Sequence, residues 1–306
     1  MKRSEFLESC RDLNEAELLR IAIRSRSLAE KRVPEEMKSL FRSLDDVTEA
    51  IEIFVETAWG KTHVYVVKET GSAEKRPVLV NVHGGGWSLP HTERDVYFCR
   101  RMAVRTGCLV FDVDYVLAPE YPYPAALEEL EALFDKLPEL CEEYGGDANR
   151  VILCGQSAGG NLLGGVMWRQ KTSLKPLAQI LCYLPADNYN DHFHGEDLDE
   201  RGMSTEYYGF FYNRNFEDRA NHDVSLALSD VEELRGLPPT DILTGGLDNL
   251  KPEAERYLAL LQEAGVPVTY RCFEKSRHGF LVNLYDEWQE GEDYVAGRIK
   301  EHLSHV

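Results

Sequence analysis

Basic residues are scarce in this chain of 306 residues. Lys and Arg together number 34 against 53 Asp and Glu, so the formal net charge is −19. Nucleic acids and anionic membrane surfaces are bound by clustered Lys and Arg, and we therefore expect no nucleic acid and no membrane as a partner. No apolar run reaches the length of a membrane span, and the first eighteen residues contain no apolar stretch of signal-peptide length.

Cysteines are few and irregularly spaced. There are seven, and no two form a C-x-x-C pair, so the spacing of a zinc or redox site is missing. Most lie in apolar runs, where a reduced core thiol is the simplest interpretation. With 43% apolar residues, a chain of this length can bury a large core without a disulfide or a metal. We therefore expect a protein of a reducing compartment, the cytoplasm.

Short apolar runs alternate with helical stretches along most of the chain. Such runs are typical of strands that are covered on both faces, and the alternation predicts one α/β domain with a mostly parallel sheet of about eight strands. Residues 1–47 are predicted as amphipathic helices. Strands are expected from residue 50 to about 55 and at 62–68, 76–82, 108–113, 150–153, 178–184, 240–244 and 268–273, with helices at 125–144, 252–264 and 286–303.

One insertion, residues 186–235, interrupts this alternation. Eight of the 32 residues at 185–216 are aromatic, which favours a lid over an apolar site, although the rings could simply pack onto the core. Residues 186–235 also carry thirteen acidic and four basic residues, a net of −9. This excess suggests a pocket entrance that disfavours anionic substrates.

The clearest motif is G-x-S-x-G, formed by Gly155-Gln156-Ser157-Ala158-Gly159 between a predicted strand and a predicted helix. In this strand–turn–helix context the motif indicates a nucleophile elbow, with Ser157 as the nucleophile. A glycine-rich turn where a helix packs closely on a sheet is the alternative.

A second motif, His83-Gly84-Gly85-Gly86-Trp87, follows an earlier strand. Consecutive glycines let backbone N–H groups converge on one point, as an oxyanion hole requires. Neither of the phosphate-binding patterns G-x-x-x-x-G-K-[ST] and G-x-G-x-x-G occurs here.

A nucleophile of this kind needs a base and an acid that follow it in the order Ser, Asp, His. His278 lies on the loop after the last predicted strand, whereas His302 and His305 end the terminal helix and are interpreted as solvated. Asp248 stands at the carboxyl end of its strand, where catalytic groups gather. Asp241 lies at the opposite end of that strand, and Asp223 is a weaker rival from the insertion. Residues 191–194 contain an Asp and two His, but on a polar loop we predict no metal site.

The order HGGGW, DYVLAPE, GQSAGG, DNL and HGF resembles the hormone-sensitive-lipase-like group (bacterial family IV type) of α/β-hydrolase carboxylesterases. The resemblance runs from about residue 50 to the end and implies the α/β-hydrolase fold. It implies a two-part helical cap, residues 1–47 and 186–235, on a catalytic domain of residues 48–306. Where the group usually has Arg this chain has Val116, and where it often has Asp this chain has Gln156.

The resemblance also implies the roles of the site residues. Ser157 is the nucleophile, His278 the base and Asp248 its partner. The amides of Gly84, Gly85 and Ala158 form the oxyanion hole. The supporting residues are His83, which braces the glycine loop, Trp87 and Gln156.

These observations predict a serine esterase that cleaves short-chain acyl esters through an acyl-enzyme, without metal or organic cofactor. The expected partner is a small-molecule ester, with a homodimer left open. Two alternatives remain: an amide or formamide hydrolase, similar to arylacetamide deacetylase, with the same triad, and a non-catalytic small-molecule-binding protein on the same fold.

Overall fold

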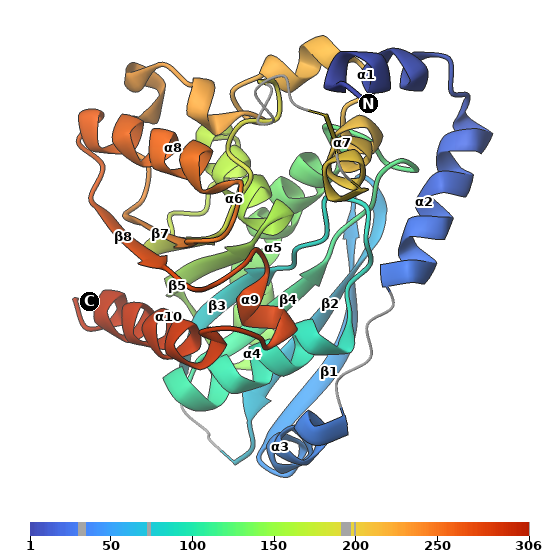
Figure 1. Ribbon diagram of the computed structural model, residues 1–306. Helices are drawn as coiled ribbons and strands as arrows, with labels where there is room; N and C mark the ends of the chain where they lie inside the picture. The colour runs from blue at the N-terminus through green and yellow to red at the C-terminus, as the bar shows by residue number, and fades with distance from the viewer. Residues whose placement is uncertain (30–34, 72–74, 191–196, 199, 306) are drawn as a thin grey trace.

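The predicted sheet is confirmed in a computed structural model that describes residues 1–29, 35–71, 75–190, 197–198 and 200–305 (Figure 1). Eight strands follow the order β1-β2-β4-β3-β5-β6-β7-β8. β1, β2 and β4 pair antiparallel, and every other neighbouring pair is parallel. The strands are β1 (Thr48–Thr57), β2 (Gly60–Glu69), β3 (Arg76–Val82), β4 (Leu109–Asp114), β5 (Gly146–Gln156), β6 (Ala178–Cys182), β7 (Thr240–Gly245) and β8 (Val268–Phe273).

Helices cover both faces of this sheet. The α-helices are α1 (Arg3–Arg11), α2 (Glu15–Ala29), α3 (Glu35–Asp45), α4 (Glu93–Thr106), α5 (Ala125–Tyr144), α6 (Ala158–Arg169), α7 (Glu200–Tyr212), α8 (Lys251–Glu263), α9 (Phe280–Asn283) and α10 (Trp288–Leu303). Three short 3-10 helices follow α7: η1 (Phe216–Ala220), η2 (Leu226–Leu228) and η3 (Val231–Leu234).

The apolar core is divided by the sheet into two parts. Successive side chains of a strand point to opposite faces, so Val78 and Val80 join the core under α5, α6 and α8, while Leu79 joins the core under α4, α9 and α10. All three of these side chains are fully buried. Burial on both faces explains why the strands are continuous apolar runs in the sequence.

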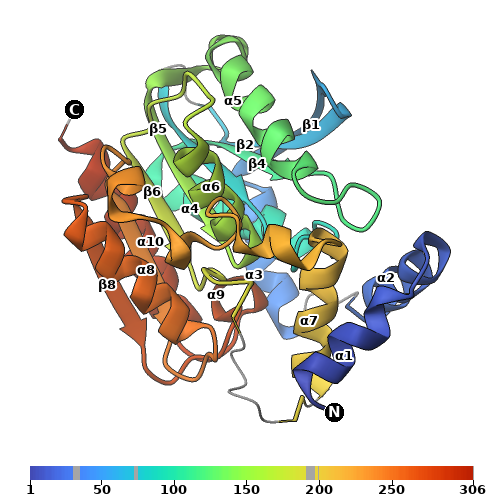
Figure 2. The same ribbon diagram turned by 90° about the horizontal axis from the view of Figure 1, so that it is seen from above.

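The first two helices and the insertion lie together beyond the carboxyl ends of the parallel strands (Figures 1 and 2). Phe6 and Cys10 of α1 pack with Leu198 and are contacted by Tyr207 of α7. By contrast, α3 lies at the other end of the molecule, where Phe41 stacks on Tyr97 of α4. Within the segment 1–47, it is therefore α1 and α2 that accompany the insertion.

A buried ion cluster fastens α1 to the insertion. Glu206 of α7 is paired with Arg3 on one carboxylate oxygen and with Arg219 on the other. Both guanidinium groups also lie over the ring of Phe216. Because all three charged side chains are buried, removing one would leave an uncompensated charge, and the cluster therefore fixes the position of α7.

Candidate active site

Ser157 lies on the sharp turn between β5 and α6. Its φ of 51° and ψ of −120° are values that L residues rarely adopt, and its backbone N–H donates to the carbonyl oxygen of Cys182 on the neighbouring strand at 2.8 Å. The turn is crowded: a Cβ on Gly159 would lie 1.9 Å from the carbonyl oxygen of Val82. The second glycine of the motif is therefore required by the close approach of α6 to β3.

The structure brings Ser157 together with His278 and Asp248. His278 Nε2 lies 2.8 Å from Ser157 Oγ, and His278 Nδ1 lies 2.7 Å from Asp248 Oδ2. Because a carboxylate only accepts, Nδ1 carries a proton and Nε2 is free to accept the hydroxyl proton of the serine. The Asp248 side chain is 1% exposed and that of His278 is 23% exposed, so the acid is buried and the base faces the cavity.

The glycine loop packs directly against the serine turn. A Cβ on Gly84 would lie 2.9 Å from the carbonyl oxygen of Gln156 and 3.3 Å from Ser157 Cβ. Ala158 is the first residue of α6, so its amide lies at the positive end of that helix. The amides assigned from sequence to an oxyanion hole thus come from two segments that meet at Ser157.

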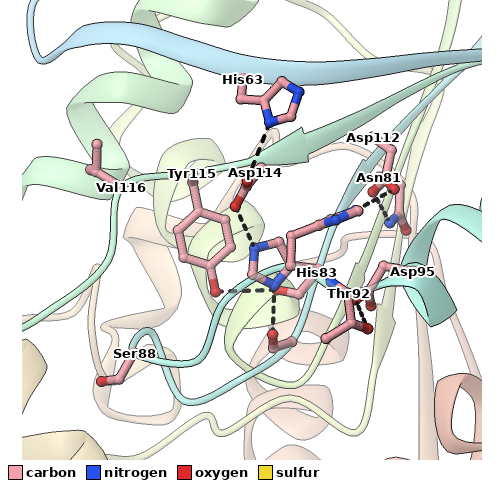
Figure 3. A network of polar contacts seen from close by, with 12 residues as sticks. His63, Asn81, His83, Ser88, Thr92, Asp95, Asp112, Asp114, Tyr115 and Val116 are labelled. Atoms are coloured by element: carbon pink, nitrogen blue, oxygen red, sulfur yellow. Dashed lines mark hydrogen bonds and ion pairs between the residues drawn. The ribbon is translucent and has the colours of Figure 1, made fainter. Parts of the chain in front are cut away.

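His83 is fully buried behind this loop (Figure 3). Its Nδ1 donates to the carbonyl oxygen of Gly84 at 2.6 Å, its ring stacks on Tyr115, and the Tyr115 hydroxyl donates to the carbonyl oxygen of His83. Asp114 faces His83 Nε2 at 3.7 Å and His63 Nδ1 at 3.5 Å. Burial would raise the pKa of Asp114, but the hydrogen bond and charge of His83, with the charges of His91 and His63, together lower it.

Trp87 and Gln156 both line the cavity and connect it to neighbouring elements. Trp87 stacks on Tyr212 of α7 with ring centroids 4.8 Å apart, so it joins the glycine loop to the insertion. The Gln156 side chain lies on the face of the sheet that α4 covers, where Nε2 donates to Asn81 Oδ1 at 2.9 Å. Val116 stands where the related group usually has Arg, and its backbone N–H donates to the Glu129 carboxylate at 2.7 Å.

A cavity of about 1030 Å³ opens above Ser157. Its wall includes Tyr208 of α7, whose ring lies so close to Gly86 that a Cβ there would be 2.5 Å from Tyr208 Cγ. Of the acidic residues of the insertion that the structure describes, Asp187 and Glu206 line the cavity, and both are paired with arginine. Among the described residues of the insertion, the acidic excess is therefore not concentrated at the cavity, and these residues give no support to an entrance that disfavours anions.

The residues that hold the His278 loop could not be predicted from any sequence motif. The Tyr285 hydroxyl donates to the carbonyl oxygen of His278, and Asn283 Nδ2 donates to that of Gly279 at 2.9 Å. Asp286 accepts from the backbone and the guanidinium of Arg277. Asp286 has a φ of 54°, a strained value that this local hydrogen bonding stabilises.

One rival of His278 was misjudged from the sequence. The prediction that His302 is solvated is wrong: its side chain is 12% exposed and its Nε2 lies 2.8 Å from Asp241 Oδ2. Amphipathic periodicity at the end of a helix does not reveal a buried carboxylate on a distant strand. His305 is exposed, and Asp223 is bound by Arg169 at 3.0 Å. The cluster at 191–194 lies outside the described residues.

Three further observations concern cysteines, metals and membranes. All seven cysteines are free thiols, and six of them are buried. Among the described residues, no group of three or more His, Cys, Asp or Glu has an arrangement that could hold a metal ion. Of the helices in the described part of the chain, none is long and apolar enough to cross a membrane.

Comparison with known proteins matches residues 79–282 to the family described as the alpha/beta hydrolase fold. The carboxylic ester hydrolase LipN of Mycobacterium tuberculosis is 32% identical over 75% of this chain and 64% of its own length. Carboxylesterase NlhH of the same organism is 32% identical over 67% of this chain and 66% of its own length, so the chain spans about two thirds of each relative. A solved esterase from Pyrobaculum calidifontis superposes with a TM-score of 0.78 at 25% identity, covering 92% of this chain and 93% of that one.

Proposed function

Because the chain belongs to the α/β-hydrolase fold family, as its hormone-sensitive-lipase-like motifs predicted, we propose that it is a serine carboxylesterase acting on short-chain acyl esters. The observation that carries the proposal is the hydrogen-bonded series from Ser157 through His278 to Asp248. The esterase names of the relatives, LipN and NlhH, support the reaction class.

In the proposed reaction Ser157 Oγ attacks the ester carbonyl and forms the new C–O bond while its proton passes to His278 Nε2. Asp248 holds the imidazole in the required tautomer and stabilises the imidazolium. The tetrahedral intermediate collapses as the ester C–O bond breaks and His278 returns the proton to the leaving alcohol. Water then repeats the sequence on the acyl-enzyme and releases the carboxylic acid.

We assign the amides of Gly84, Gly85 and Ala158 to the oxyanion that forms in both steps. Donors placed before the reaction begins cost no reorganisation when charge develops, which is why such sites contribute strongly to turnover. The proton that His83 donates to the carbonyl oxygen of Gly84 polarises the peptide whose N–H belongs to Gly85. His83 therefore both fixes the loop and strengthens one of the three donors.

The short acyl preference is supported by the polarity of the insertion along the cavity. Ser204, Thr205 and Glu206 of α7 all line it, so a long acyl chain would bury methylene groups against polar side chains. A series of p-nitrophenyl esters from acetyl to palmitoyl tests this preference. We expect the largest kcat/KM at two to about six acyl carbons, and a maximum at long chains would contradict it.

Replacing the nucleophile tests the reaction class. Ser157→Ala is expected to lower kcat by about three to six orders of magnitude. A fluorophosphonate probe should label the unmodified chain at Ser157 and leave the variant unlabelled. Turnover near the original value in the variant would refute the proposal. If matched amide substrates are hydrolysed faster than the esters, the protein is an amidase and not an esterase.

A further inference from the structure

A row of buried polar side chains crosses three neighbouring strands directly beneath Ser157. His91, on the loop before α4, contacts Asp112 of β4, which contacts Asn81 of β3, which contacts Gln156 of β5. The three distances are 2.7, 2.7 and 2.9 Å. Figure 3 shows Asn81 and Asp112 joined in this polar row. All three strand residues point to the face covered by α4, as their alternation with the buried residues of the strands requires.

The hydrogen bonds in the polar row have a fixed direction. Burial would lower the pKa of His91, but the charge and hydrogen bond of Asp112, with the charges of Asp95 and Asp114, together raise the pKa to about 9. Burial would raise the pKa of Asp112, but the charge and hydrogen bond of His91, with the hydrogen bond of Asn81 and the charge of His83, together lower it. At neutral pH the carboxylate therefore only accepts, and Asn81 must present its NH₂ group to it. The Asn81 oxygen is then left to accept from Gln156, which sets the orientation of that amide.

Gln156 occupies the junction of the two segments that carry the proposed oxyanion donors. It directly precedes Ser157, and its carbonyl oxygen is the nearest heavy atom to a Cβ built on Gly84. Its side chain is 1% exposed, so any change of rotamer there must displace a neighbour. The position of the Gly84 and Gly85 amides relative to Ser157 therefore depends on how the Gln156 side chain is held.

We propose that His91 and Asp112 are positioning residues for the oxyanion hole, acting through Asn81 and Gln156. His91 lines the cavity and Asp112 does not, and we assign neither of them a contact with a reacting atom. Their effect is to hold the end of β5 and the glycine loop in one arrangement. The proposal rests on the serine esterase function proposed above, and it gives Gln156, the departure from the related group, a defined partner.

A purely structural role predicts something different, and the chain offers a matched control. His302 and Asp241 form a second buried His–Asp pair, with an N–O distance of 2.8 Å, at the amino end of β7. Its burial and geometry are similar to those of the His91–Asp112 pair, but it lies at the opposite end of the sheet from Ser157. Replacing one member of either His–Asp pair should lower the free energy of unfolding. Only the polar row should affect turnover.

The experiment compares Asn81→Leu and His91→Leu with His302→Leu on a short-chain p-nitrophenyl ester. Asn81 does not line the cavity, so its variant isolates the polar row from direct substrate contact. For Asn81→Leu and His91→Leu we expect kcat to fall at least about tenfold with KM within about twofold, and Ki of a trifluoromethyl ketone to rise by the same factor as kcat falls. For His302→Leu we expect both kcat and Ki to stay within about twofold.

Two outcomes would overturn the inference. One is a loss of kcat in Asn81→Leu no larger than in His302→Leu. The other is a rise of KM alone, confined to His91→Leu, which would mean direct substrate contact. If Asn81→Leu does not fold, His91→Leu decides between the two roles: a fall in kcat at unchanged KM supports the positioning role, and a rise in KM at unchanged kcat contradicts it. Fluorophosphonate labelling at Ser157 in each variant separates these results from a failure of the esterase proposal itself.

Discussion

Substituting Gly84 by Ala is the most direct way to move the proposed oxyanion donors without touching the triad. The φ of Gly84 lies outside the left-handed region, so an alanine is allowed there by the backbone. The added methyl group, however, would lie 2.9 Å from the carbonyl oxygen of Gln156 and 3.3 Å from Ser157 Cβ. The first contact involves backbone, which cannot turn aside as a long side chain can.

The size of the effect follows from this overlap. A separation of 2.9 Å is about 0.5 Å short of an ordinary carbon–oxygen contact, so the glycine loop must retreat from Ser157 by roughly that amount. Hydrogen bonds to a developing oxyanion are effective at about 2.7–3.1 Å, and the shift would weaken those from both Gly84 and Gly85. Loss of a single such donor costs about 10²–10³ in kcat. We therefore expect Gly84→Ala to lower kcat about 100-fold.

Steady-state kinetics with p-nitrophenyl acetate and thermal unfolding together check this expectation. KM should change by no more than about threefold, because the donors act on the transition state. Overpacking should cost about 1–3 kcal/mol of stability. The matched control is Gly297→Ala on the exposed face of α10, where a Cβ meets nothing within 4 Å. This control should keep its kcat and gain stability. A folded Gly84→Ala variant with kcat within threefold of the original would refute the reasoning.

Three further expectations concern other parts of the molecule. Asp248→Asn should lower kcat about 10⁴-fold at unchanged fold, because the amide favours the wrong imidazole tautomer; stopped-flow or steady-state assays measure this. The pKa of Asp241 lies below its usual range, because the hydrogen bonds and charges of His302 and Arg298 outweigh burial. The ionised Asp241 carboxylate therefore stabilises the folded state above its unfolded pKa of about 3.9, and this stabilisation is lost as the pH falls through its folded pKa. In urea unfolding experiments, the free energy of unfolding of Asp241→Asn should therefore change less between pH 7 and pH 3 than that of the original protein. In the native protein, a thiol reagent should react rapidly with no cysteine other than the partly exposed Cys272, whereas in denaturant it should react with all seven. Several rapidly reacting thiols in the native protein would contradict the burial of the other six.

The strands, and the motifs that carry the proposed triad residues, could be read from the sequence because they depend on local patterns. An apolar run such as 76–82 is buried on both faces whatever its partners are, and the predicted bounds agree with β3. The helix at 125–144 likewise coincides with α5. The requirement for Gly155 is also local, because a Cβ there would lie 2.6 Å from backbone atoms of Gly159 and Gly160 in the same turn, whereas Gly159 is required by its contact with β3.

Partners that meet only in the folded chain could not be predicted in the same way. His302 and Asp241 are 61 residues apart in the sequence, and no pattern around either residue predicts that they form a hydrogen bond. Asp112 did carry a signal, since a carboxylate inside an apolar strand must find a buried partner. Identifying that partner as His91 required the path of the loop between β3 and α4.

The ion cluster that fastens α1 to α7 also bears on how the protein is made. Arg3 and Glu206 are separated by 203 residues, so the ribosome completes one partner long before the other. Glu206 of α7 lines the cavity. The wall of the cavity is therefore complete only after α7 has been synthesised and α1 has packed against α7. Strands β1 to β6 precede α7 and can assemble earlier. Substrate binding is thus expected to be acquired late in biosynthesis, after much of the sheet that carries Ser157 is in place.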